Sequence, residues 1–169
     1  MSLELRSGTP ADAEAIDRVF RKSFCATFAH LYRPADLAAF LAQFTLEQWR
    51  SELADPAFAF EVAADGTGLV GYVKLGPIKF PVEDTGPAIL LSQLYVAPDH
   101  VGSGVGRELM ERAFAEARHR RKEQLYLTVF VDNDRARRFY ERYGFEPVGR
   151  YEFMVGSQAD EDIVMRKAL

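Results

Sequence analysis

The sequence has one cysteine, few histidines and no long apolar run, and each shortage excludes a class of protein. Its single cysteine, Cys25, cannot form a disulfide within the chain and suits a reducing compartment. The three histidines show no paired His or Cys spacing, so we predict no metal site. No stretch approaches the ~18 apolar residues of a membrane span, and the first residues lack the apolar core of a signal peptide. We therefore expect a cytoplasmic protein without a membrane partner.

Neither sign of charge dominates the chain. It carries 21 Lys and Arg against 25 Asp and Glu, a net charge of −4, so we expect no nucleic-acid partner. The one basic run, residues 118–122, ends a predicted helix, where cations complement the helix dipole. With 48% hydrophobic residues the chain can bury an ordinary core, and its length predicts a single domain over residues 1–169.

Hydrophobic periodicity and turn residues predict a strand, helices, a strand hairpin, a strand–helix–strand–helix unit and two last strands. The predicted strands are residues 3–6, 58–64, 69–75, 88–96, 125–131, 145–155 and 162–167. The predicted helices run from a Thr9 cap to residue 28, over 36–54 with a break near Thr45, from a glycine cluster to about residue 122, and from an Asp132 or Asn133 cap to Gly144. Residues 76–87 form a loop. This order describes an α/β (α+β) fold with a mixed sheet flanked by helices.

The glycine cluster lies between a predicted buried strand and an amphipathic helix. Its residues are Val101, Gly102, Ser103, Gly104, Val105, Gly106 and Arg107. Alternate glycines remove side chains that would keep an anion from the backbone, and the helix start supplies free N–H groups and a positive dipole end. Such a turn suits a pyrophosphate, although glycines can also serve only to make a tight turn.

Two common phosphate loops do not match the cluster. A P-loop needs Lys followed by Ser or Thr after its last glycine, and neither pair occurs here. A dinucleotide fingerprint that starts at Gly102 would need glycine at Arg107, and one that starts at Gly104 would need glycine at Leu109. Both common phosphate loops are therefore excluded by residue count, and a tight strand-to-helix turn without a phosphate stays open.

Together with a second motif about thirty residues further on, the cluster resembles that of a GNAT-superfamily N-acetyltransferase. The matching segments are Leu94-Tyr-Val-Ala-Pro98, the loop 101–106, and Asn133-Asp-Arg-Ala136-x-x-Phe139-Tyr140-Glu-x-x-Gly144-Phe145. They cover roughly residues 88–150. The chain departs from the pattern at the head of the loop, where the usual Gln or Arg is Val101, preceded by His100.

The resemblance implies a mostly antiparallel sheet of six to seven strands, with a β-α-β-α core that binds acetyl-CoA as co-substrate. It implies that the strand at 94–96 pairs with the pantetheine arm, that the loop holds the pyrophosphate, that Asn133 binds the pantetheine and that an arginine such as Arg142 meets the 3′-phosphate. The residues it places at the cofactor are Leu94, Tyr95, Val96, Val101, Gly102, Ser103, Gly104, Val105, Gly106, Arg107, Asn133, Ala136, Phe139, Tyr140 and Arg142. Pairing through end strands, and so a homodimer, is also common in this family.

The implied reaction needs a neutral amine, a stabilised oxyanion and a proton for the departing thiolate. An alkyl amine with a pKa of ~10.4 is protonated at neutral pH, so a group must accept its proton. Backbone N–H groups of residues 94–96 are the expected oxyanion donors, and the Tyr140 hydroxyl is the predicted acid. Tyr140 would otherwise be a packing residue on its helix.

No general base is identified from the sequence. The strand at 88–96 offers only Ser92 and Gln93, while Glu61 and Glu152 could act through water. A Cys25–His30 acyl-enzyme has no orienting third residue.

The chain's end narrows the acceptor only slightly. It resembles that of bacterial spermidine/spermine N-acetyltransferases, and its acidic segment 160–162, expected in a solvated hairpin turn, could suit a cation. A small-molecule amine or polyamine is the expected acceptor. A protein N-terminus or lysine, or a non-catalytic acyl-CoA-binding role, stays open.

Overall fold

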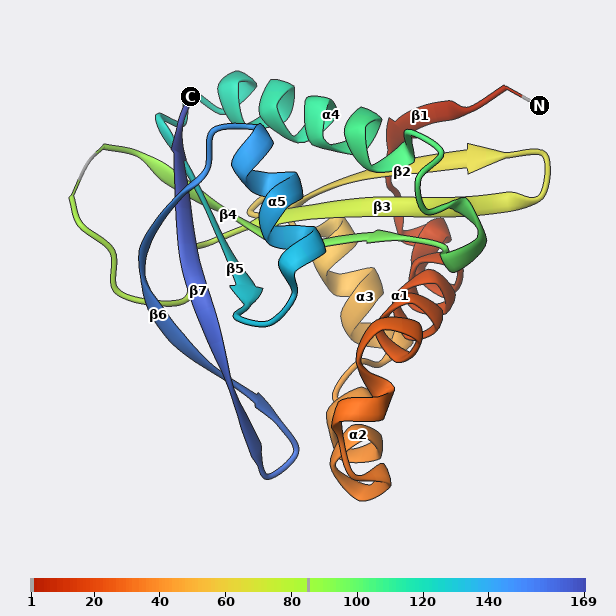
Figure 1. The fold of residues 1–169 in the computed structure, drawn as a ribbon. Coiled ribbons are helices and arrows are strands. Elements are labelled where there is room, and N and C mark those ends of the chain that lie inside the picture. The colour runs from red at the N-terminus through yellow and green to blue at the C-terminus, as the bar shows by residue number, and fades with distance from the viewer. Residues whose placement is uncertain (1, 85) are drawn as a thin grey trace.

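The structure is a computed structural model that describes residues 2–84 and 86–169. Seven strands form one sheet in the order β1-β2-β3-β4-β5-β7-β6, with helices on both of its faces (Figure 1). The strands are β1 (Glu4–Ser7), β2 (Ala59–Asp65), β3 (Gly68–Gly76), β4 (Ala88–Val96), β5 (Gln124–Phe130), β6 (Glu146–Val155) and β7 (Gln158–Ala168). The helices are α1 (Ala13–Phe28), α2 (Pro34–Leu41), α3 (Leu46–Ala54), α4 (Val105–His119) and α5 (Asp134–Arg142). Among the strand pairs only β4 and β5 run parallel, which confirms the predicted mixed, mostly antiparallel sheet.

Helix starts and breaks follow the capping residues. The chain after Thr9 first makes a short 3-10 turn, Pro10–Asp12, and the Asp12 carboxylate accepts a hydrogen bond of 2.8 Å from the Thr9 N–H. The predicted break near Thr45 is confirmed, because the Thr45 hydroxyl caps α3 by accepting from the Gln48 N–H at 3.1 Å. Helix α4 ends at His119, so Arg120, Arg121 and Lys122 of the basic run lie beyond the helix.

Two apolar cores lie on opposite faces of the sheet. On one face α4 buries its predicted stripe against the strands, including Leu109, Met110 and Ala113. On the other face α1 and α3 bury a second, aromatic core that includes Phe20 and Trp49. None of the helices described here is long and apolar enough to cross a bilayer.

The middle of the sheet opens between β4 and β5. The two strands pair only over Ala88–Leu90 and Gln124–Tyr126, although each continues for several residues. The β3–β4 register also shifts around Ser92, since Lys74 pairs with Gln93 and Leu75 with Leu91. A bulge of this kind bends a strand and turns the following side chains. The last part of β4 therefore has a free edge inside the sheet.

The β6–β7 hairpin is longer than predicted, which corrects the acidic segment. β7 begins at Gln158, so Asp160 and Asp162 lie within a strand, and each is 7% exposed instead of standing in a solvated turn. The hairpin tip contacts α2, because the Asp36 carboxylate accepts from the N–H and the hydroxyl of Ser157, both at 2.8 Å. These bonds fix the hairpin against the start of α2.

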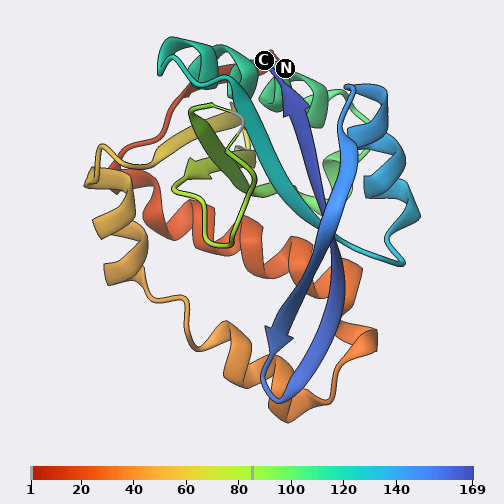
Figure 2. The same ribbon diagram turned by 90° about the vertical axis from the view of Figure 1, so that its left-hand side faces the viewer.

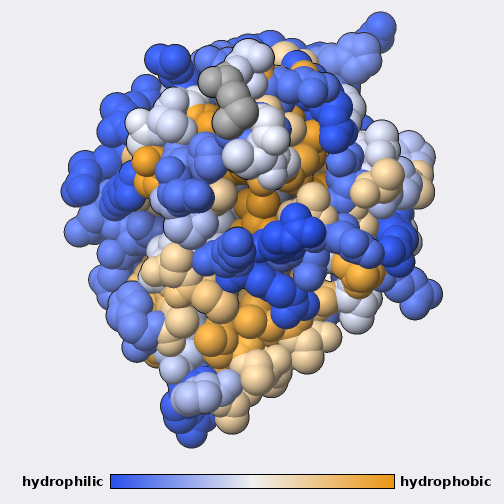
Figure 3. Space-filling model, turned by 90° about the vertical axis from the view of Figure 1, so that its right-hand side faces the viewer, coloured by the Kyte–Doolittle hydropathy of each residue, from blue (hydrophilic) through white to orange (hydrophobic). Residues whose placement is uncertain are grey.

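The chain between β3 and β4 folds back over the sheet face next to β6 and β7 (Figure 2). Its Phe80 ring packs against Tyr126 of β5 and Tyr151 of β6, with ring centroids 6.4 Å and 5.4 Å apart. Residue 85 of this predicted loop lies outside the described residues. On the face that carries α1 and α2, apolar side chains gather towards the lower end of the molecule (Figure 3).

Candidate active site

The opening between β4 and β5 presents backbone groups of β4. The Ala97 N–H bonds to the Val70 carbonyl of β3 at 2.8 Å. Because successive residues of a strand direct their N–H and C=O groups to opposite sides, the amides of Leu94 and Val96 point away from β3, into the opening. The Val96 carbonyl is met there by the buried Ser23 hydroxyl, at 2.9 Å. β4 can thus accept an extended partner along its free edge.

The glycine cluster forms an open turn before α4. Gly102 and Gly104 have φ angles of 85° and 93°, a backbone region that glycine adopts without strain. A Cβ atom at Gly102 would meet nothing within 4 Å. The first helical N–H bond is made by Glu108 to Gly104, so the amides of Val105, Gly106 and Arg107 have no partner within the helix. This turn has the room and the donors for an anion.

Helix α5 packs against the same turn. The Phe139 ring lies 3.6 Å from the position a Cβ of Gly106 would occupy, an ordinary contact distance, so α5 lies directly beside the turn. The Asn133 Oδ1 accepts from the Ala136 N–H at 3.3 Å, which caps α5 and leaves the Asn133 side-chain NH₂ available. Arg142 is exposed near the Phe139 ring.

Tyr140 lies on α5 with its ring packed against Phe139 and Phe145. Burial raises the pKa of its hydroxyl, so this group stays protonated at neutral pH. A protonated hydroxyl is the form that an acid needs. Its predicted role is not tested by this geometry and stays a prediction.

The opening holds two further titratable groups. Tyr95 of β4 has its pKa raised by burial, and both Tyr140 and Asp162 lie near enough to raise it further. The pKa of Asp162 is raised to about 6, mainly by burial and also by Asp160, against a lowering by the nearby Thr128 hydroxyl. Side chains from β4, α5 and β7 therefore converge on the place where β4 and β5 separate.

Asp162 is the functional candidate that sequence reasoning missed. It was placed with solvated turn residues, yet a strand begun at residue 158 puts Asp160, Asp162 and Val164 in one row on one face. The spacing of two residues between these positions was the sequence signal for this burial. A carboxylate on the same strand face as a buried valine belongs to the strand and not to a solvated turn.

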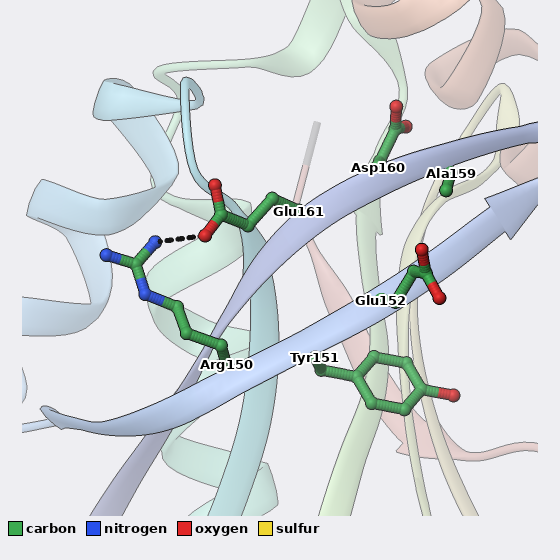
Figure 4. Close-up of a pocket in the computed structure, with 6 residues that line it drawn as sticks. All are labelled: Arg150, Tyr151, Glu152, Ala159, Asp160 and Glu161. Carbon is green, nitrogen blue, oxygen red and sulfur yellow. Dashed lines mark hydrogen bonds and ion pairs between the residues drawn. The ribbon is translucent and has the colours of Figure 1, made fainter.

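The acidic candidates named from the sequence lie elsewhere. Glu61 is buried under α4 and accepts two hydrogen bonds from the Arg112 guanidinium, at 2.8 and 3.0 Å. That pair is structural, and it removes Glu61 from the candidate bases. Figure 4 shows Glu152 on the hairpin beside the Arg150–Glu161 ion pair, whose N–O distance is 3.0 Å. Glu152 itself is exposed.

The start of α2 and the end of α1 border the opening. The Tyr32 hydroxyl donates a hydrogen bond to Asp160, and the ring of Phe28 approaches that of Phe130, with centroids 6.3 Å apart. His30 is exposed and Cys25 is half-buried.

His100 takes the place before the glycine turn. Its Nε2 lies 3.0 Å from Asp65 and its Nδ1 lies 3.3 Å from Asp99, and these carboxylates raise the pKa of His100, Asp65 most. Val101, where the family pattern has a longer polar residue, is 44% exposed. His100 thus ties the turn to the β2–β3 hairpin.

Comparisons with known proteins identify relatives of this arrangement. A family model described as the acetyltransferase (GNAT) family matches residues 19–145. An uncharacterised N-acetyltransferase from the pepI 3′ region of Lactobacillus delbrueckii subsp. lactis is 29% identical over 154 residues, covering 89% of this chain and 88% of that protein. The N-alpha-acetyltransferase RimI of Mycobacterium tuberculosis is 34% identical over 117 residues, covering 64% and 66%. The structure of the PaiA N-acetyltransferase of Thermoplasma acidophilum, in complex with coenzyme A, has a TM-score of 0.81 at 21% identity over all of both chains.

Proposed function

Because the chain belongs to the acetyltransferase (GNAT) family and is an N-acetyltransferase, we propose that it transfers the acetyl group of acetyl-CoA to a primary amine by direct attack. The acceptor is a small molecule, with polyamines among the candidates. The observation that carries the proposal is the free edge of β4 next to the open glycine turn. A ligand with an extended arm and a diphosphate fits that combination.

The residues present suit coenzyme A on two counts. The free amides of Leu94 and Val96 can pair with the pantetheine arm as with an added strand. The unpartnered amides at the start of α4, with the open space at Gly102, can hold the diphosphate. Asn133 keeps donors for the pantetheine amides. The relative with 21% identity, in complex with coenzyme A, is consistent with this assignment.

The chain's own groups then divide the proton transfers. Bound acetyl-CoA supplies the acetyl group as a thioester. The Asp162 carboxylate, with its pKa of about 6, is ionised at neutral pH and accepts a proton from the incoming ammonium. The β4 amides stabilise the negative charge on the carbonyl oxygen, and the Tyr140 hydroxyl donates its proton to the departing sulfur. The amine nitrogen gains the acetyl group as the carbon–sulfur bond breaks, and the second proton that this nitrogen loses passes through solvent to the Tyr140 oxygen, which restores the hydroxyl.

The test uses release of free thiol from acetyl-CoA with a panel of amines. Tyr140→Phe should lower kcat by roughly 10²–10⁴ with little change in the KM for acetyl-CoA, because only the proton donor is lost. Tyr143→Phe is the matched control, since Tyr143 is a half-buried tyrosine of the same segment. An unchanged kcat in Tyr140→Phe would remove that residue from the mechanism, and absence of thiol release with every amine would refute the function.

A further inference from the structure

A cavity of about 460 Å³ lies on the sheet face under the β3–β4 loop. Its floor is formed by Tyr126 of β5 and Val164 of β7, and Phe80 of the loop and Tyr151 of β6 form its walls. Lys79 and Arg166 stand at its rim. The cavity is therefore aromatic inside, with the Arg166 guanidinium among its lining groups.

The cavity begins beside the proposed base. Tyr151 pairs directly with Asp162 across the β6–β7 hairpin, and Val164 is the next residue of β7 on the same face. Arg166 follows in the same row. Since a strand rises about 3.3 Å per residue, Arg166 lies about 13 Å from Asp162 along β7. One row of side chains thus runs from a carboxylate, past apolar walls, to a guanidinium.

At the Arg166 end of the cavity, two polar groups lack a full set of hydrogen-bond partners. The ion pair of Arg166 with the exposed Glu83 of the loop is loose, at 3.7 Å. The Tyr126 hydroxyl is buried and lies beside the Arg166 guanidinium without completing a normal hydrogen bond, and it has no other partner among residues 2–84 and 86–169. A buried hydroxyl without a partner costs stability unless a ligand or water meets it.

We propose that this cavity binds the far end of the acceptor, and that this end is a carboxylate or similar anion joined to the amine by an apolar spacer. The proposal rests on the proposed function and narrows its acceptor. The ammonium group would lie at Asp162 and Asp160, the spacer between Phe80 and Val164, and the anion at Arg166. The anion would replace Glu83 at the guanidinium and accept from the Tyr126 hydroxyl.

Charge favours this acceptor over a polyamine. A polyamine would place a second cation beside the Arg166 guanidinium, where like charges repel. A carboxylate there gains charge-assisted hydrogen bonds instead. The acidic pair Asp160 and Asp162 serves only the end of the acceptor that reacts.

The experiment compares linear ω-aminocarboxylates with alkylamines and diamines of equal chain length, and with spermidine, by thiol release from acetyl-CoA. We expect kcat/KM to be about tenfold or more higher for the aminocarboxylate of best length than for the matched alkylamine. Arg166→Gln should remove most of that preference and leave the alkylamine rate unchanged. Lys79→Gln, a change at an exposed loop residue that should not disturb folding, should reduce the preference in part.

Lys22→Gln, an equal change of charge on the exposed side of α1, is the control and should have no effect. Equal rates for alkylamine and aminocarboxylate, or a preference for spermidine, would overturn the proposal while the acetyltransferase function stood. If no amine releases thiol, calorimetry of wild type and Arg166→Gln with the aminocarboxylates tests binding to the cavity independently of catalysis. Heat in wild type that is lost in Arg166→Gln supports the site, and no heat in wild type refutes it.

Discussion

The Tyr32 hydroxyl donates a hydrogen bond to the carboxylate of Asp160, a residue 128 positions further along the chain. Tyr32 follows α1 and Asp160 lies in β7, so this bond joins the first helices to the last hairpin at the mouth of the proposed site. Burial and the acceptor carboxylate raise the pKa of Tyr32, and the hydroxyl therefore remains a donor at neutral pH. The acceptor side of the site thus depends on a contact between residues that are far apart in the sequence.

We expect Tyr32→Phe to lower the free energy of unfolding by about 1.5–3 kcal/mol, the range for hydrogen bonds to charged groups. The change removes only the hydroxyl, and the ring can still stack on Phe24, whose centroid is 6.1 Å away. Urea denaturation at neutral pH measures the loss. In a double-mutant cycle with Asp160→Asn the two effects should not add, and full additivity would show that the bond contributes nothing.

Gly102 offers a test of the turn that separates strain from ligand contact. Gly102→Ala places a methyl group in the open space before α4, and its positive φ costs an alanine about 1–2 kcal/mol. Gly68→Ala is the matched control, because Gly68 also has a positive φ and open space around its Cβ but lies in the β2–β3 hairpin. Both variants should lose similar stability. Only Gly102→Ala should weaken CoA binding, by tenfold or more in calorimetry, and equal Kd values would place the diphosphate elsewhere.

Most of the fold could be predicted because local patterns and tertiary packing agree. The α4 stripe, the helix break near Thr45 and the Asp65–Gly68 hairpin are short-range signals, and each lies where it was expected. The glycine turn was also found, since a glycine that must adopt positive φ leaves its mark in the sequence. What periodicity cannot give is how far two parallel strands stay paired. The extent of the opening between β4 and β5 came only from the structure, whereas a free edge at residues 94–96 was implied by the family resemblance and not by periodicity.

The proposed base shows the same limit. Asp162 is acidic, and acidic residues near a hairpin turn are usually solvated, so its burial depends on β6, β5 and Tyr95 packing around it. The pairing of Glu61 with Arg112 likewise joins residues 51 positions apart. Long-range partners decide which carboxylates are structural and which face the site.

His100 should make stability depend on pH in a defined direction. Its folded pKa is raised above the ordinary histidine value of 6.5, chiefly by Asp65. Its contribution to stability is therefore fully present below about pH 6.5 and is lost as the pH rises through the folded pKa. His100→Gln should therefore lower the Tm at about pH 5.5 and leave it unchanged at about pH 9. His119→Gln, at an exposed position, is the control. A difference that persists at high pH would show that the contact does not depend on charge.

Asp162 gives the sharpest test, because stability and activity should move in opposite directions. Its folded pKa of about 6 lies above the ordinary aspartate value of 3.8, so the folded protein binds the proton more tightly than the unfolded chain does. Stability therefore falls as the pH rises from about 4 to about 6, and the full cost is present above that range. Asp162→Asn removes this cost and should stabilise the protein by on the order of 1–2 kcal/mol at about pH 8, with little change at about pH 4.

The same variant should lose activity. If Asp162 accepts the amine proton, kcat/KM in wild type should rise with pH through an apparent pKa near 6, a value shaped also by Asp160 and Tyr95. Asp162→Asn should lower kcat by roughly 10²–10⁴ and abolish that limb of the pH profile. Asp160→Asn is the matched control for loss of a neighbouring negative charge, and it should retain the limb at a lower apparent pKa. A fully active Asp162→Asn would leave the carboxylate as a buried structural group and require another base.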